Sequence, residues 1–214
     1  ATGANAVAGA EHAWALILAC AKSIPQLDAR MHAGHWDKPT HKSLELGGRT
    51  LGLVGLGAIG RRTAAIGVAM NMRVLGFDPF VTQAPPGVTL VPLAELFATS
   101  DVVSLHCPLT PENRNLINRE TLATFREGAI LVNTARGGLI DEAALVEALR
   151  SGRLRAAGLD SFSAEPPPTD YPLRGVPGVI MTPHIGGVTS DAYVNMGVAA
   201  ARNVLDVLAN APNT

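Results

Sequence analysis

Short apolar runs that alternate with helical segments are the feature that most constrains the fold of this chain. Strands that alternate with helices are typical of parallel sheets joined by right-handed crossovers, with helices on both faces. The sequence therefore predicts an α/β fold built on a doubly wound parallel sheet. The predicted strands are Thr50–Val54, Arg73–Phe77, Asp101–His106, Ala129–Asn133, Arg155–Leu159 and Val179–Met181, and the predicted helices cover 58–70, 92–99, 118–125 and 141–151.

Two segments flank this alternation. Glu11–Ser23 is apolar on nearly every side, which predicts a helix that ends before Pro25 and is buried all round, within this chain or against another subunit. Residues 26–48 are expected to form an irregular arm. At the other end, residues 190–208 predict an amphipathic helix. Its apolar stripe consists of Val194, Val198, Ala201, Leu205 and Leu208.

Composition excludes several classes of partner. Seventeen Lys and Arg nearly cancel eighteen Asp and Glu, so a net charge of −1 gives no electrostatic reason to expect a nucleic acid or an anionic membrane. No basic-then-apolar leader opens the chain and no apolar run is long enough to span a bilayer, so we expect a soluble cytoplasmic protein. The start at Ala1, without Met, suggests part of a longer protein.

A glycine-rich turn follows the first predicted strand and opens the next helix. Gly55 permits a tight turn, Gly57 lets a pyrophosphate approach the backbone, and Gly60 lets helix and strand pack closely. The helix N-terminus faces the bound anion. Such turns are common, but the strand, the turn and the helix occur here in the order of a Rossmann-type dinucleotide site.

The second predicted strand ends at Asp78, 18 residues after Gly60. An acid at this position can accept hydrogen bonds from both ribose hydroxyls of adenosine and would repel a 2′-phosphate. No Arg or Lys occurs in residues 79–83 to receive that phosphate, so NAD is favoured over NADP. In the alternative interpretation, the glycines form a structural turn and Asp78 caps a loop.

Polar residues follow the ends of the remaining strands. Ligands of open parallel sheets bind outside the carboxyl ends of the strands, so these residues are expected to converge. They are His106, Cys107 and Pro108 after the third strand; Thr134, Ala135 and Arg136 after the fourth; Asp160 and then Glu165 after the fifth; and Thr182 to Gly187 after the sixth.

Three of these residues suit hydride transfer between a nicotinamide and C2 of a 2-oxo acid. Arg136 can hold the substrate carboxylate and polarise the carbonyl with a planar cation. His184 can move a proton to or from the C2 oxygen, and Glu165 can orient that imidazole and favour its protonated form. Each has a plainer interpretation: Arg136 as a structural anion site, His184 as a turn-capping residue and Glu165 as an exposed loop acid.

Three histidines near the start of the chain raise the question of a metal site. His32, His35 and His41 lack a Cys or acid cluster that would complete a set of ligands, so no metal is expected.

The sequence resembles the D-isomer-specific 2-hydroxyacid dehydrogenases, most closely their D-3-phosphoglycerate dehydrogenase branch. Five motifs carry the resemblance in order: GGRTLGLVGLGAIGR, HCPLTPENRNLIN, GAILVNTARGGLIDEAALVEAL, AGLDSFSAEPP and TPHIGGVT. The resemblance implies that Arg136, Glu165 and His184 are catalytic, with His184 the proton donor in reduction. It also implies that Asp160 holds the nicotinamide carboxamide and that the substrate is a small 2-oxo or 2-hydroxy acid. The implied NAD contacts include Ala58, Ile59, Asp78, Cys107, Thr134, Ala135, Arg136, Asp160, His184, Gly186 and Gly187.

Members of this family also have a substrate-binding domain, most of which this chain lacks. The resemblance implies an inter-domain helix and dimerisation arm in residues 1–48, an NAD-binding domain in 49–188 and the C-terminal helix in 189–214. It further implies a homodimer formed through residues 11–45. Two alternatives remain: a glyoxylate or hydroxypyruvate reductase, or another D-2-hydroxyacid dehydrogenase, within the same enzyme class, and an NAD-sensing scaffold like the co-repressors that share this fold.

Overall fold

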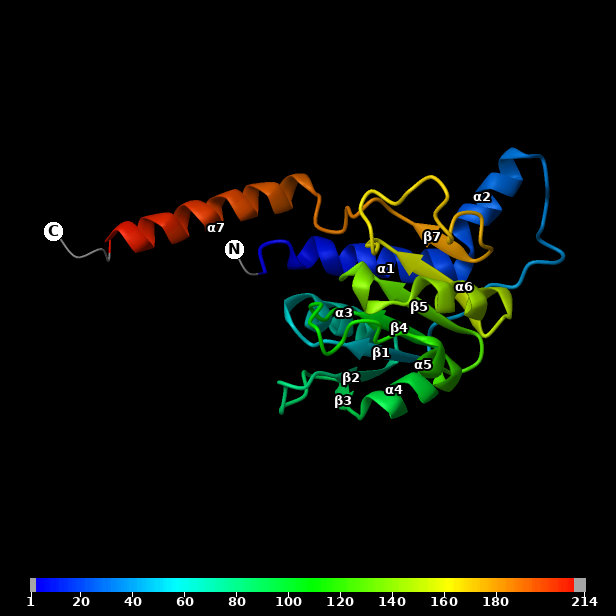
Figure 1. Cartoon of the computed structure of the whole chain (residues 1–214), viewed down its shortest axis with the longest axis horizontal. Coiled ribbons are helices and arrows are strands. Elements are labelled where there is room, and N and C mark those ends of the chain that lie inside the picture. Colours follow the sequence, from blue (N-terminus) through cyan, green and yellow to red (C-terminus); the bar gives the residue numbers. More distant parts are fainter. Residues whose placement is uncertain (1–2, 210–214) are drawn as a thin grey trace.

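The computed structural model describes residues 3–209, which form one seven-stranded parallel sheet with helices on both faces (Figure 1). The strand order β3-β2-β1-β4-β5-β6-β7 reverses direction between β1 and β4, as in a doubly wound Rossmann-type sheet. The predicted fold class is therefore confirmed. The strands are β1 Thr50–Val54, β2 Arg73–Phe77, β3 Val88–Leu90, β4 Val102–Leu105, β5 Ala129–Asn133, β6 Leu154–Leu159 and β7 Val179–Met181.

Seven α-helices accompany these strands in the described residues: α1 Ala6–Lys22, α2 Ile24–His32, α3 Ala58–Ala69, α4 Leu93–Thr99, α5 Arg119–Thr124, α6 Glu142–Arg150 and α7 Ser190–Ala209. A short 3₁₀ turn, Gly137–Leu139, follows β5. Most predicted strands and helices agree with these bounds to within one residue or two, because buried parallel strands leave long apolar runs in a sequence.

Two apolar clusters lie on the two faces of the sheet, because successive strand residues point to opposite sides. Leu51 and Leu53 face a cluster that includes Trp14 of α1 and Ala64 of α3. Val54 faces the other cluster, which contains Phe97 of α4 and residues of α5 and α6. The sheet is thus covered on both faces, and only its strand ends are left for a site.

The N-terminal segment agrees with the prediction only in part. Helix α1 packs against α3 and β5–β7 and leaves Val7 and Leu18 exposed in this chain, so burial on every side, which the prediction allowed against another subunit, stays a prediction. Residues 26–48 are not wholly irregular, since α2 continues to His32. Pro25 does not end the helical region, because it lies in the first turn of α2, where the missing proline N–H costs no hydrogen bond. The left-handed Ser23 forms the corner between the two helices.

Strand β3 is absent from the predicted set. It has three residues and pairs only with β2 at the edge of the sheet. Its neighbourhood is rich in Pro and Gly, so it carries no apolar run longer than the strand itself. Edge strands of this length leave a sequence signal too weak to separate from a loop.

Helix α7 confirms the predicted C-terminal helix and projects beyond the rest of the molecule (Figure 1). Its apolar side chains are exposed, including Val194, Val198, Leu205 and Leu208, and among its described residues only Ala192 is buried. Across residues 3–209, no helix combines the length and apolarity needed to cross a bilayer. The proposed division of the chain at residues 48 and 188 stays a prediction.

Candidate functional site

The glycine turn lies at the carboxyl end of β1, where the strand order reverses. Gly55 has φ +98°, and a Cβ there would lie 2.7 Å from the backbone nitrogen of Cys107. A Cβ at Gly60 would lie 2.1 Å from the Gly55 carbonyl oxygen. By contrast, a Cβ at Gly57 would meet no atom within 4 Å. The first and third glycines are therefore needed by the protein itself, and the second leaves open space for a ligand at the N-terminus of α3, beside Ala58 and Ile59.

Asp78 joins the end of β2 to this turn. One carboxylate oxygen accepts a hydrogen bond from the Leu56 backbone N–H at 2.8 Å, and the other accepts one from the Phe80 N–H at 2.9 Å. The carboxylate is thus held beside the glycine turn and keeps free lone pairs. This position fits the predicted contact with ribose hydroxyls.

Arg136 follows β5 on a turn that Asn133 shapes. The buried Asn133 amide donates to the Arg136 carbonyl oxygen at 2.9 Å and accepts from the Ala135 N–H at 3.0 Å. The Arg136 guanidinium is exposed and donates to the Ala135 carbonyl oxygen at 2.6 Å. A Cβ at Gly137 would lie 1.9 Å from the carbonyl carbon of Phe162, so this glycine lets the Arg136 turn pack directly on the loop that carries Glu165.

Glu165 and His184 form a hydrogen-bonded pair. The Glu165 Oε2 lies 2.7 Å from Nδ1 of His184, and its Oε1 accepts the Phe162 N–H at 3.0 Å. Burial alone would raise the pKa of the Glu165 carboxyl. The hydrogen bonds from His184 and Phe162 and the charges of His184 and Arg136 outweigh it, and together they lower this pKa. The acid is therefore ionised, and Nε2 is the ring nitrogen of His184 left for a ligand.

Asp160 lies behind this pair at the end of β6 and is buried. Its Oδ1 accepts the Thr182 hydroxyl at 2.6 Å and the Ile185 N–H at 3.0 Å, and its Oδ2 accepts the Gly186 N–H at 2.7 Å. The carboxylate therefore anchors the loop that carries His184. Its predicted contact with a nicotinamide carboxamide stays a prediction.

His106, Cys107 and Pro108 follow β4, next to Gly55. The His106 ring lies 2.9 Å from the Ser104 hydroxyl, and burial lowers the pKa of this histidine to about 4. Burial also raises the pKa of the Cys107 thiol, and the charge of Asp78 adds to the rise. His106 is neutral near pH 7 and has a partner within the chain, as expected of a strand-end residue and not of an acid catalyst.

The lowered pKa of His106 predicts a pH-dependent stability. Between pH 6.5 and about 4 the unfolded chain takes up a proton at this residue and the folded chain does not, so the free energy of unfolding falls as the pH falls. The full shift would correspond to about 3 kcal/mol, and solvent screening at this partly buried ring reduces it to about 2 kcal/mol. Chemical denaturation at pH 7 and pH 4 should show this loss, and the His106→Gln variant should lose correspondingly less. An equal loss of unfolding free energy in the unmodified protein and in His106→Gln would contradict the lowered pKa of His106.

One residue of this edge carried no signal in the sequence. His12 of α1 lies 2.9 Å from the Thr182 hydroxyl oxygen and 3.2 Å from Oδ1 of Asp160, although 170 positions separate it from Thr182.

Within residues 3–209, no group of three or more His, Cys, Asp or Glu side chains is placed to hold a metal ion.

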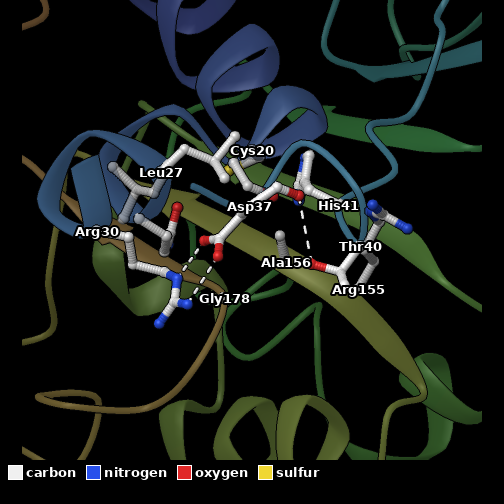
Figure 2. Close-up of a pocket in the computed structure, with 12 residues that line it drawn as sticks. Cys20, Leu27, Arg30, Asp37, Thr40, His41, Arg155, Ala156 and Gly178 are labelled. Atoms are coloured by element: carbon white, nitrogen blue, oxygen red, sulfur yellow. Dashed lines mark hydrogen bonds and ion pairs between the residues drawn. The ribbon is translucent and has the colours of Figure 1, made fainter. Parts of the chain in front are cut away.

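A separate pocket of about 400 Å³ lies at the opposite edge of the sheet (Figure 2). Its walls come from α1, α2, the following arm and the amino ends of β6 and β7, including Cys20, Leu27, Arg155 and Gly178. An ion pair between Arg30 and Asp37 closes one side. This pocket is not part of the edge that carries Arg136, Glu165 and His184.

Comparison with known proteins decides the family. A family model described as "D-isomer specific 2-hydroxyacid dehydrogenase, NAD binding domain" matches residues 14–186. The chain belongs to this family. The matched region covers the whole sheet, and the domain that it describes binds NAD. The Rossmann-type turn and Asp78 described above fit that cofactor.

Relatives within the family carry different names. The chain is 41% identical over 215 residues to a D-3-phosphoglycerate dehydrogenase of Archaeoglobus fulgidus, a match that covers 99% of this chain and 41% of that protein. It is 42% identical to a hydroxypyruvate reductase of Thermotoga maritima, covering 96% of the chain and 68% of the relative. The crystal structure of the TT0316 protein of Thermus thermophilus superposes with a TM-score of 0.91 at 42% identity, covering 99% of this chain and 69% of that one. The chain thus spans about two fifths of the phosphoglycerate dehydrogenase.

Proposed function

We propose that this chain is the NAD-binding part of a dehydrogenase that transfers a hydride between nicotinamide and C2 of a D-2-hydroxy acid or 2-oxo acid. The observation that carries the proposal is the Glu165–His184 pair, which lies at the same sheet edge as Arg136 and the glycine turn. The charge of Arg136 also helps to lower the pKa of Glu165. Bound NADH supplies the hydride, and the side chains supply binding and proton transfer.

Each of the three residues has a role that its contacts support. The exposed Arg136 guanidinium binds the substrate carboxylate and polarises the C2 carbonyl. His184 donates a proton from Nε2 to the C2 oxygen during reduction and accepts it during oxidation. Glu165 fixes the ring through Nδ1 and compensates the charge of the imidazolium, because its own carboxyl remains ionised.

The cofactor site is proposed to follow the edge from β2 to β7. The glycine turn and the N-terminus of α3 take the pyrophosphate, and Asp78 takes the adenosine ribose. The remaining residues surround the nicotinamide half. The complete proposed set is Gly55, Gly57, Ala58, Ile59, Gly60, Asp78, His106, Cys107, Pro108, Thr134, Ala135, Arg136, Asp160, His184, Gly186 and Gly187.

Phosphohydroxypyruvate and hydroxypyruvate are the two substrates that the relatives favour. The similarity to a D-3-phosphoglycerate dehydrogenase supports the first, and the similarity to a hydroxypyruvate reductase supports the second. Both are 2-oxo acids, so the same arrangement of Arg136, Glu165 and His184 serves either. Residues outside this chain are expected to select between them.

Turnover by the complete gene product tests the proposal. Reduction of a panel of 2-oxo acids with NADH should yield the D-hydroxy acid, with NADPH used less well because Asp78 repels its 2′-phosphate. Residues 1–214 alone should bind NAD and turn over poorly. NADH binding without turnover of any 2-oxo acid would contradict the proposal and favour an NAD-sensing scaffold.

The proposal extends to assembly and location. Helix α2 buries none of its side chains, and Ile24, Met31 and Trp36 are exposed, which supports contact between two copies through residues 11–45. A monomer at micromolar concentration in sedimentation equilibrium would count against this dimer. A cytoplasmic location stays a prediction.

A further inference from the structure

The His12 side chain of α1 contacts residues at the base of the loop that carries His184. Its Nε2 lies 2.9 Å from Oγ1 of Thr182 and 3.2 Å from Oδ1 of Asp160, and the His12 side chain is 18% exposed. Thr182 is in turn 2.6 Å from the same carboxylate oxygen. Three residues from α1, the end of β6 and the end of β7 therefore form one compact network.

The direction of each hydrogen bond in this network follows from counting protons. The Thr182 hydroxyl has one proton, and its short contact with the Asp160 carboxylate, which only accepts, uses that proton. The Thr182 oxygen must therefore accept from His12, so Nε2 of His12 carries a proton. This holds for a neutral and for a charged imidazole alike.

The network holds the backbone that follows His184. The residues after it, Ile185 and Gly186, donate their N–H groups to Asp160. His184 itself has φ +55°, a left-handed conformation that costs energy for a residue other than glycine. A Cβ at Gly186 would lie 2.9 Å from Oδ2 of Asp160 and 3.4 Å from Cδ2 of His12, so the loop, the carboxylate and α1 are in contact.

We propose that His12 is a positioning residue for His184. Its Nε2–H fixes the Thr182 hydroxyl and the Asp160 carboxylate, and these hold residues 184–186 in the strained conformation that presents the His184 ring. This inference rests on the proposed function for its catalytic consequence only. The network itself is testable without turnover.

Two substitutions of His12 separate the hydrogen bond from packing. His12→Phe keeps an aromatic ring and removes the donor, whereas His12→Gln returns an amide N–H near the position of Nε2. In the complete gene product, His12→Phe should lower kcat for reduction of a 2-oxo acid by about tenfold or more, with the Kd for NADH within threefold. His12→Gln should recover most of kcat. An equal loss of kcat in both variants would overturn the proposal. So would a loss of activity that is explained by weaker binding of NADH.

Hydrogen exchange provides the readout that does not depend on activity. The Ile185 and Gly186 amides should exchange at least tenfold faster in His12→Phe and near the original rate in His12→Gln. Unchanged exchange in His12→Phe would overturn the proposal. If the unmodified protein turns over no 2-oxo acid, the proposed function fails while this measurement still decides the role of His12.

A variant on the other side of the contact keeps the proposal testable if His12→Phe does not fold. Thr182→Val removes the hydroxyl and keeps the shape, and it should speed exchange of the same two amides. Thr99→Val, which removes a hydroxyl bonded within α4, is the matched control and should leave them unchanged. The effects of His12→Phe and Thr182→Val should be clearly non-additive in the double variant. Additive effects, or unchanged exchange in Thr182→Val, would overturn the proposal.

Discussion

The His184→Gln substitution is expected to lower kcat/KM for reduction of a 2-oxo acid by about 10² to 10⁴, the usual contribution of general acid catalysis. Glu165 holds Nδ1 of the ring at 2.7 Å, so Nε2 is the group that can protonate the C2 oxygen. Glutamine keeps a similar size and polarity but cannot transfer this proton at neutral pH. Steady-state kinetics of the complete gene product measure the effect.

Cofactor affinity is the control for this variant. The Kd for NADH, measured by fluorescence titration, should stay within a few-fold because the glycine turn and Asp78 are untouched. A kcat/KM within a few-fold of the unmodified protein would show that His184 does not act as the acid. A loss confined to NADH binding would reduce His184 to a cofactor contact.

The Arg136→Gln substitution should lower kcat by about 10² to 10³, as does removal of one positioned donor from an oxyanion site. It should also raise KM for the 2-oxo acid, because we propose that the planar guanidinium binds the substrate carboxylate, an arrangement that allows two parallel hydrogen bonds. Arg136→Lys keeps the positive charge but not the planar guanidinium with its paired N–H donors, so it should recover only part of the lost activity. Separate measurement of kcat and KM distinguishes the two contributions.

Arg119→Gln is the matched control for Arg136. Arg119 begins α5 and forms an exposed ion pair with Glu147 of α6, and it is not among the proposed site residues. Exposed ion pairs contribute little, so this variant should keep kcat and KM within a few-fold. Equal losses in the Arg119 and Arg136 variants would point to a general effect of charge and would contradict the role given to Arg136.

The sheet edge was predictable because buried parallel strands are easy to recognise in a sequence. Each buried strand is an apolar run, and whatever follows it lies at the same edge as the residues after every other strand. The sequence therefore predicted that Arg136, Glu165 and His184 lie at the same edge. In the structure, Glu165 and His184 are in contact. The glycine turn was predictable for the same local reasons, from the order of strand, turn and helix.

Features that depend on tertiary contact left no such signal. Nothing near His12 in the sequence indicates Thr182, because the contact exists only once α1 packs beside β7. Strand β3 is too short and too close to prolines to stand out, and Pro25 serves equally well to end a helix or to begin one. Gly137 occurs among ordinary turn residues, and only the packed Phe162 backbone shows why a side chain is excluded there.

A crystal structure of the complete gene product with NAD and a 2-hydroxy acid tests the central claim most directly. The pyrophosphate should lie at Gly55–Gly60, the adenosine ribose at Asp78, and the substrate carboxylate on Arg136. Nε2 of His184 should lie within hydrogen-bonding distance of the C2 oxygen, while Nδ1 stays on Glu165. A nicotinamide ring bound away from this edge, or a His184 ring turned from the substrate, would contradict it.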